Sequence, residues 1–345
     1  MRVLIVKRDK LGDLLLSTGV IEHLKASRPD LEVHLLVNDY NAWVARDEPA
    51  LARTWVYPRV RHAGRMRVGA LLAQVPLAWK LRRAAFDWAI AMGGEESPRA
   101  VRRAIATGAR RVVAYADDPT RYGPRLTDPL PIPAHGHEIA RMLSLLAPLR
   151  VEPPARMPVP VYRFPPEGDA FANGWLAERG LATGRYIVLG IGTRFAQRQP
   201  SVEQVLRWTA RFSEHWDLPT VFLWTPGNAD AGLYPGDDPI AARVLARPLP
   251  YLHAQRGTLQ QALALIAHAR VSIMPDSGLM HFAAASPGGV VGLFADPAEA
   301  GAADRWGPVG PRARFLQAQN TITELSDESV MAALEPLVSR GPAPV

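Results

Sequence analysis

Cysteine is absent from this chain of 345 residues. Its absence excludes a disulfide framework, a thiolate metal site and a cysteine nucleophile, and it fits a reducing compartment. Long apolar runs are lacking too. The opening MRVLIVKRDK has no secretory signal, and the most apolar later stretch, 68–79, is too short to span a bilayer and contains Gln74 and Pro76. We therefore expect a cytoplasmic protein.

Several motifs of familiar sites are also missing. The chain has no Walker A loop, no H-E-x-x-H and no D-x-D, a pattern that often holds a metal–diphosphate, and its nine histidines show no ligand spacing. The G-I-G at 190–192 lacks the third glycine of a dinucleotide fingerprint. These absences favour chemistry without a bound metal or a cofactor.

Charge is distributed unevenly along the chain. Residues 1–152 hold 24 Lys and Arg against 16 Asp and Glu, whereas residues 153–345 hold 16 against 17. A basic half indicates an anionic partner, and nucleic acid, an acidic lipid headgroup or a phosphorylated sugar would all qualify. The alternative is solubility combined with a preference for arginine, since 36 of the 40 basic residues are Arg.

Short apolar runs alternate with helical stretches. A helix is expected at 14–26, and helix starts are marked by capping boxes at Ser201 with Gln204 and at Thr258 with Gln261. Continuous apolar strands separated by helices predict parallel sheets covered on both faces. The expected strands are 3–6, 33–37, 88–92, 111–116, 186–191, 220–224, 271–274 and 289–294.

Composition divides the chain in two. Residues 151–166 contain six prolines, which stiffen the backbone and remove hydrogen-bond donors. We predict two Rossmann-like, doubly wound α/β domains facing a cleft, with ligands at the carboxyl ends of the strands. The expected boundaries are 1–152 for the first domain, 153–166 for a Pro-rich linker, 167–325 for the second domain, and 326–345 for a last helix and tail that could return to the first domain.

The segment K-R-D-K-L-G-D, residues 7–13, follows the first expected strand. Gly12 would allow a tight turn into a helix whose N-terminus stabilises an anion. Asp13 at a strand end could accept a proton from an attacking hydroxyl, or it could simply cap the helix.

The segment P-D-S-G-L-M-H, residues 275–281, repeats this arrangement in the second half. Ser277 and Gly278 would offer backbone N–H groups to a diphosphate, Asp276 could bond a sugar hydroxyl, and His281 could point back at the phosphates. Alternatively, Asp276 caps the helix and His281 faces the core.

Two arginine clusters are candidates for anion binding. In G-I-G-T-R-F-A-Q-R-Q-P, residues 190–200, Arg194 and Arg198 could each fork onto a phosphate, or they could be solvated in a surface loop. In the first half of the chain, basic residues flank the apolar stretch 68–79. They could contact lipid headgroups, or they could form an ordinary solvated face. These residues are Arg59, Arg61, Arg65, Arg67, Lys80, Arg82 and Arg83.

These segments, in this order, resemble glycosyltransferase family 9. The opening VLIVKRDKLGDLLLSTGVIEHLKASRPDLEVHLLV is similar to its N-terminal signature, FDWAIAMGGEES resembles its next strand and loop, and residues 258–281 resemble its second signature. RWGPVG, residues 305–310, resembles the loop that follows.

The resemblance implies a GT-B fold and an inverting, metal-independent heptosyltransferase. The donor would be ADP-L-glycero-D-manno-heptose or a related nucleotide sugar, and the acceptor a lipopolysaccharide inner core or a similar anionic glycan. No nucleic-acid partner is expected, and contact with the inner membrane surface would be peripheral. The implied base is Asp13. The implied donor-binding residues are Thr193, Arg194, Arg198, Asp276, Ser277, Gly278, Leu279 and His281, and the implied acceptor-binding residues are Lys7, Lys10, Gly12, Arg59 and Arg61.

The sequence departs from the family at two places. Gln197 and Gln199 stand where the family has Lys and Trp in K-x-W-P, so Arg194 or Arg198 would have to neutralise the leaving diphosphate. The family's acidic residue after W-G is displaced, leaving Asn228 or Asp230. A non-catalytic nucleotide-sugar-binding homologue is therefore a second reading. A nicotinamide-dependent oxidoreductase is a third, although the fingerprint for it is missing.

Overall fold

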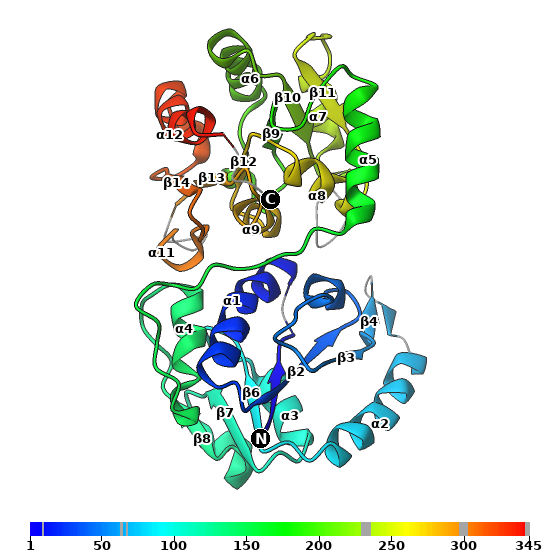
Figure 1. Cartoon of the computed structure of the whole chain (residues 1–345), viewed down its shortest axis with the longest axis vertical. Helices are drawn as coiled ribbons and strands as arrows, with labels where there is room; N and C mark the ends of the chain where they lie inside the picture. Colours follow the sequence, from blue (N-terminus) through cyan, green and yellow to red (C-terminus); the bar gives the residue numbers. More distant parts are fainter. Residues whose placement is uncertain (9, 63–64, 67, 229–235, 297–302, 342–345) are drawn as a thin grey trace. The chain divides into compact units, whose positions relative to one another are not determined.

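Each half of the chain folds around its own six-stranded parallel sheet, as the computed structural model shows (Figure 1). The division falls between Arg163 and Phe164, which gives unit 1, residues 1–163, and unit 2, residues 164–345. The structure describes residues 1–8, 10–62, 65–66, 68–228, 236–296 and 303–341, with backbone alone for those within 61–67.

Unit 1 has the strand order β3-β2-β1-β6-β7-β8. The central strand β1 (Arg2–Val6) pairs in parallel with β2 (Glu32–Asn38) and β6 (Trp88–Ala91). The remaining strands are β3 (Arg53–Tyr57), β7 (Arg111–Tyr115) and β8 (Asp128–Leu130), with a separate hairpin of β4 (Arg61–His62) and β5 (Arg65–Met66). The helices are α1 (Leu11–Ser27), α2 (Val68–Arg83), α3 (Pro98–Ala106) and α4 (Glu138–Ser144), with 3-10 turns η1 (Ala42–Ala45), η2 (Pro119–Arg125) and η3 (Ala147–Leu149).

Unit 2 repeats that order as β11-β10-β9-β12-β13-β14. Its strands are β9 (Ile187–Gly190), β10 (Thr220–Leu223), β11 (Leu252–Gln255), β12 (Val271–Pro275), β13 (Val290–Phe294) and β14 (Ala313–Gln317). Its helices are α5 (Pro166–Ala177), α6 (Val202–Trp216), α7 (Asp238–Val244), α8 (Leu259–Ala267), α9 (Gly278–Ala284), α11 (Ala303–Trp306) and α12 (Asp327–Ser339), with 3-10 turns η4 (Ala196–Arg198) and η5 (Ile322–Glu324). The predicted α/β fold of two doubly wound parallel sheets is confirmed.

The central strands follow from their composition. Val3, Leu4, Ile5 and Val6 of β1 are all fully buried, as expected for a strand with helices on both faces. Both predicted capping boxes form: Gln204 N–H donates to Ser201 Oγ at 3.1 Å and Gln261 N–H to Thr258 Oγ1 at 3.3 Å. These caps begin α6 and α8 where the sequence predicts.

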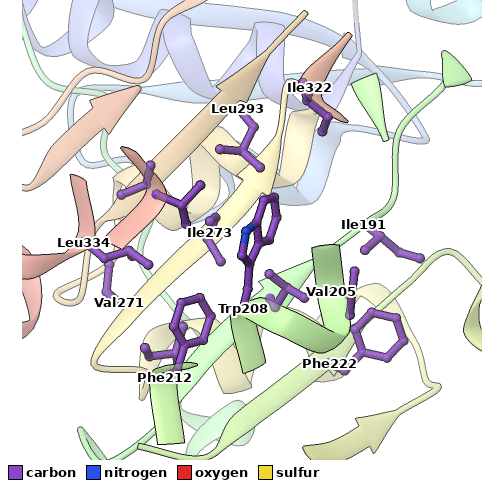
Figure 2. Packing of buried hydrophobic residues seen from close by; sticks show 14 of the residues in the cluster. Ile191, Val205, Trp208, Phe212, Phe222, Val271, Ile273, Leu293, Ile322 and Leu334 are labelled. Carbon is purple, nitrogen blue, oxygen red and sulfur yellow. The ribbon is translucent and has the colours of Figure 1, made fainter. Parts of the chain in front are cut away.

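The core of unit 2 is built around Trp208 of α6 (Figure 2). Its indole is fully buried among Phe212, Ile273 and Leu293, and its N–H donates to Asp327 Oδ1 at 2.9 Å. The buried side chains of α12, among them Leu334, belong to this same core. The suggestion that the last helix returns to the first domain is therefore not supported.

The Pro-rich segment lies against α1. Val161 N–H donates to Thr18 Oγ1 at 2.8 Å, and a Cβ on Gly19 would lie 2.6 Å from the Val159 carbonyl oxygen. Arg163 then bonds Glu22 Oε1 at 3.1 Å and Glu48 Oε2 at 3.0 Å. The Pro-rich segment is thus held on unit 1 as far as Arg163, the last residue of that unit.

Candidate functional site

The strand order in each unit reverses direction at one point, between β1 and β6 in unit 1 and between β9 and β12 in unit 2. In open parallel sheets, ligands bind beyond the carboxyl ends of the strands at such a point. Residues 7–13 follow β1, residues 191–200 follow β9, and Asp276 follows β12. The three segments singled out in the sequence therefore occupy the positions that this topology favours for binding.

In unit 2, the loop after β9 packs tightly against the end of β10. A Cβ on Gly192 would lie 2.6 Å from Thr225 Oγ1, so a larger residue there would force the Thr225 side chain to shift. The next residue, Thr193, has a buried hydroxyl that makes no hydrogen bond within the part of the chain that the structure describes. A buried hydroxyl of this kind is a candidate ligand contact, because burial without a partner is costly.

Arg198 and Asp276 come together in unit 2. Arg198 Nη1 donates to Asp276 Oδ2 at 2.5 Å, and the two side chains are 10% and 11% exposed. Burial lowers the pKa of the Arg198 guanidinium and Asp276 raises it in part, but arginine keeps its charge at such positions. The pair joins the loop after β9 to the loop after β12 and fixes a cation at the switch point.

Arg194 differs from Arg198. It is exposed, and its guanidinium lies 5.6 Å from the centroid of the Phe195 ring. Arg198 lies 4.7 Å from that same ring. Of the two arginines that could replace the family lysine missing at Gln197, only Arg198 is therefore held by an ion pair with a described partner.

The segment after β12 has the expected strand–turn–helix form. The N-cap of α9 is Ser277, so Asp276 does not occupy the cap position. The Ser277 side chain makes no capping hydrogen bond. Gly278 is exposed and Leu279 is half-buried in the first turn of α9. His281 is buried, at 5% exposure, within α9.

A carboxylate that the sequence analysis missed, Asp237, supports this site. Gln199 Nε2 donates to Asp237 Oδ1 at 2.7 Å, and Thr225 N–H donates to Asp237 Oδ2 at 3.0 Å. Burial raises the pKa of the Asp237 carboxyl. Gln199, in the family's Trp position, thus ties the loop after β9 to the start of α7.

The neighbouring Asp238 has the opposite environment. It accepts both Arg256 Nε and Nη2, at 3.0 and 2.9 Å, and Trp224 Nε1 at 2.7 Å. The hydrogen bonds from Arg256 lower the pKa of the Asp238 carboxyl. Asp-Asp-Pro at a helix start was the signal that could have identified this pair. Asn228 is exposed, and Asp230 lies outside the described residues.

In unit 1, Asp13 is the third residue of α1. Its Oδ2 accepts the backbone N–H of the exposed Lys10 at 3.1 Å, so Asp13 does cap the helix. The carboxylate is half-buried rather than enclosed. Gly12 lies inside the first helical turn, which corrects the expectation of a tight turn at that residue.

Lys7 is fully buried at the end of β1. Its Nζ lies 3.6 Å from Met142 Sδ of α4. Glu138, on the same helix α4 as Met142, accepts the Gly94 N–H through its Oε1 at 2.7 Å. A Cβ on Gly94 would lie 2.1 Å from the Glu138 carboxylate. Glu138 is a further residue that the sequence analysis missed, and in its present position its carboxylate leaves no room for a Cβ at Gly94.

The two predicted basic acceptor contacts in the loop after β3 stand differently. Arg59 pairs with Asp39 Oδ1 at 3.1 Å and lies over the Tyr40 ring, 4.6 Å from its centroid. Arg61 is in β4, and its side chain lies outside the described part. Among the residues that the structure describes, no three His, Asp or Glu side chains are grouped as a metal site would need.

The fold of the chain is of the GT-B type. With two units of this strand order, the chain matches solved GT-B-type structures over nearly its whole length. The glycosyltransferase family 9 protein of Veillonella parvula has a TM-score of 0.81 at 17% identity, covering 99% of this chain and 97% of that one. E. coli ADP-heptose LPS heptosyltransferase II has a TM-score of 0.73 at 17% identity, covering 99% of both chains. At such identities the likeness shows the fold.

A third solved structure, E. coli heptosyltransferase WaaC with ADP, has a TM-score of 0.73 at 18% identity and covers 98% of this chain and 100% of that one. The family match is more particular: residues 236–334 match the model described as glycosyltransferase family 9 (heptosyltransferase). No curated protein matches the chain. The resemblance to family 9 is confirmed for this segment, and with it the predicted class, a glycosyltransferase.

Proposed function

We propose that the protein is an inverting, metal-independent heptosyltransferase. The donor is a nucleotide-diphosphate sugar, with ADP-L-glycero-D-manno-heptose as the first candidate, and the acceptor is a lipopolysaccharide inner core or a similar anionic glycan. The observation that carries the proposal is the family match to residues 236–334, because it includes Asp276, Ser277 and His281 at the switch point of unit 2. The E. coli structures of the same fold are heptosyltransferases, one of them with ADP.

In the proposed reaction, unit 2 binds the donor. The Thr193 hydroxyl and Arg198 lie on the loop after β9, and Gly278 opens α9 beside Asp276. As the bond between the anomeric carbon and the diphosphate oxygen breaks, negative charge grows on the diphosphate. A guanidinium already fixed in place stabilises that charge without further reorganisation.

Unit 1 supplies the base in this proposal. Asp13 takes the proton of the acceptor hydroxyl as its oxygen bonds to the anomeric carbon, and a single displacement of this kind inverts the configuration. The hydrogen bond from Lys10 N–H occupies one of the several lone-pair positions of a carboxylate, so capping and proton transfer are compatible. Exposed Lys10 and the basic character of residues 1–152 favour an anionic acceptor.

The test is transfer of heptose from ADP-heptose to a truncated lipopolysaccharide, followed as the mass gain of one heptosyl unit. Asp13→Asn removes the base while retaining size, and we expect kcat to fall on the order of 1000-fold with donor affinity unchanged. Asp47→Asn, an exposed carboxylate of the same unit, is the matched control and should retain activity. Full activity of Asp13→Asn would contradict the assignment.

The non-catalytic alternative is motivated by Gln197, which stands in the place of the family lysine. It predicts that the wild-type chain binds nucleotide sugars, seen as thermal stabilisation across a panel, without transfer or donor hydrolysis. Binding of NAD in place of any nucleotide sugar would instead indicate the oxidoreductase.

A further inference from the structure

Helix α2 of unit 1 carries an unusual outer face. Of the twelve exposed large hydrophobic side chains among the described residues, five lie on this helix. They are Val68, Leu71, Leu72, Val75 and Trp79, exposed by 60%, 53%, 65%, 66% and 58% respectively. Four of them, at 68, 72, 75 and 79, have spacings of four, three and four residues, so they form one stripe along the helix.

The opposite face of α2 fixes the helix on unit 1. Leu81 is buried in the core of the unit and Leu77 packs against it. Gln74 Nε2 donates to the Pro58 carbonyl at 2.9 Å, and Gln74 Oε1 accepts a hydrogen bond from Arg103 Nη2 at 3.0 Å. Because the inner face is used in this way, the apolar stripe faces outward in unit 1.

The stripe lies in a basic stretch of the sequence. Residues 49–86 contain eight Lys and Arg and no Asp or Glu. Lys80, Arg82 and Arg83 are in the last turn of α2, and the Arg83 guanidinium lies 4.5 Å from the centroid of the Trp79 ring. An apolar stripe with an aromatic ring and a basic flank is complementary to lipid acyl chains beneath an anionic headgroup layer.

We propose that α2 is a surface-docking helix for an anionic phospholipid bilayer. Its stripe inserts at the level of the headgroups, and its terminal basic side chains bind lipid phosphates. No helix among the described residues is long and apolar enough to cross a membrane, and none is needed for this mode. The charge favours lipid over a second copy of the chain, because two copies meeting at this face would bring their like charges together.

The experiment is co-sedimentation of the full chain with vesicles of phosphatidylethanolamine and phosphatidylglycerol, compared with vesicles of phosphatidylcholine. We expect binding to the anionic vesicles alone, weakened by added salt. Leu72→Gln, Val75→Gln and Trp79→Gln combined should reduce the partition coefficient at least about tenfold, and so should Lys80→Gln with Arg83→Gln. The substituted side chains are exposed, so folding should be retained.

Matched controls remove the same chemistry elsewhere. Ile132→Gln with Met157→Gln changes exposed apolar residues outside α2, and Arg156→Gln with Arg247→Gln removes two exposed charges. Both should bind as the wild type does. Equal binding by the α2 variants, or no binding by the wild type, overturns the proposal, as does a dimer in sedimentation velocity that the stripe variant abolishes without any vesicle binding. No donor sugar is required, so the result is independent of the proposed enzymatic activity.

Discussion

Unit 1 and unit 2 share one strand order but use it differently. In unit 1 the residues after the central strands are occupied by internal contacts: Lys7 lies against Met142, and Gly94 is capped by Glu138. In unit 2 the equivalent loops hold the ion pair of Arg198 and Asp276. The same topology therefore carries a helix-capping carboxylate, Asp13, in one unit and an ion-paired guanidinium, Arg198, in the other, so the loops determine which charged groups lie at the switch point.

The largest expected effect on stability separates a buried tryptophan in unit 2 from an exposed one in unit 1. Trp208→Ala removes a fully buried indole from the core of unit 2, and it should lower the free energy of unfolding by about 3–5 kcal/mol. Trp79→Ala removes an exposed indole from unit 1 and should change the free energy of unfolding by less than about 0.5 kcal/mol. Urea denaturation followed by circular dichroism measures both. Equal losses would mean that α2 is not outward-facing in solution.

The two arginines of unit 2 sharpen the comparison at the level of catalysis. Arg198→Ala should lower kcat for heptose transfer about 100-fold, because the reaction proposed above uses this buried cation to stabilise the negative charge that grows on the diphosphate. Arg194→Ala should have an effect below about tenfold, since that side chain is exposed. Arg198→Lys tests whether charge alone suffices. If Arg194→Ala has the larger effect, the fixed-cation assignment is wrong.

The smallest expected effect distinguishes two neighbouring carboxyls. The pKa of Asp237 is raised above its ordinary 3.8 by burial, so its contribution to stability is present at low pH and is lost as pH rises through the folded-state value. The pKa of Asp238 is lowered by Arg256, so its contribution is present above 3.8 and is lost as pH falls below it.

Melting temperatures of Asp237→Asn and Asp238→Asn across pH 3–7 check these opposite signs. As pH rises, the melting temperature of Asp237→Asn should increase relative to that of the wild type, and the melting temperature of Asp238→Asn should decrease relative to it. Each change should occur in the pH range where the carboxyl concerned titrates. Parallel shifts in the two variants would contradict the environments described for them.

The sequence predicted the strands that are buried on both faces and missed those at the edges. β1, β2, β6 and β7 of unit 1 and β9, β10, β12 and β13 of unit 2 are mostly apolar and almost wholly buried. The edge strands β3, β8, β11 and β14 were not predicted, because an edge is partly exposed and tolerates polar residues, as in LHAQ of β11.

The site was predicted as a set of segments but not as a set of contacts. The position of residues 7–13, 190–200 and 275–281 at strand ends follows from local pattern, and the topology places them at the switch points. The Arg198–Asp276 pair and the Gln199–Asp237 bond join residues 78 and 38 positions apart, and no local pattern encodes such pairing. Glu138 was missed for the same reason, since its partner Gly94 is 44 residues away.

The attachment of the Pro-rich segment to α1 bears on how the protein can be divided. A fragment that stopped at the compositional boundary near residue 152 would uncover Thr18 and Gly19 and leave the buried Glu48 carboxylate without Arg163. A fragment extended through Arg163 keeps that covering intact. The proper end of an isolated N-terminal half is therefore set by hydrogen bonding and steric fit, eleven residues beyond the point at which the amino-acid composition changes.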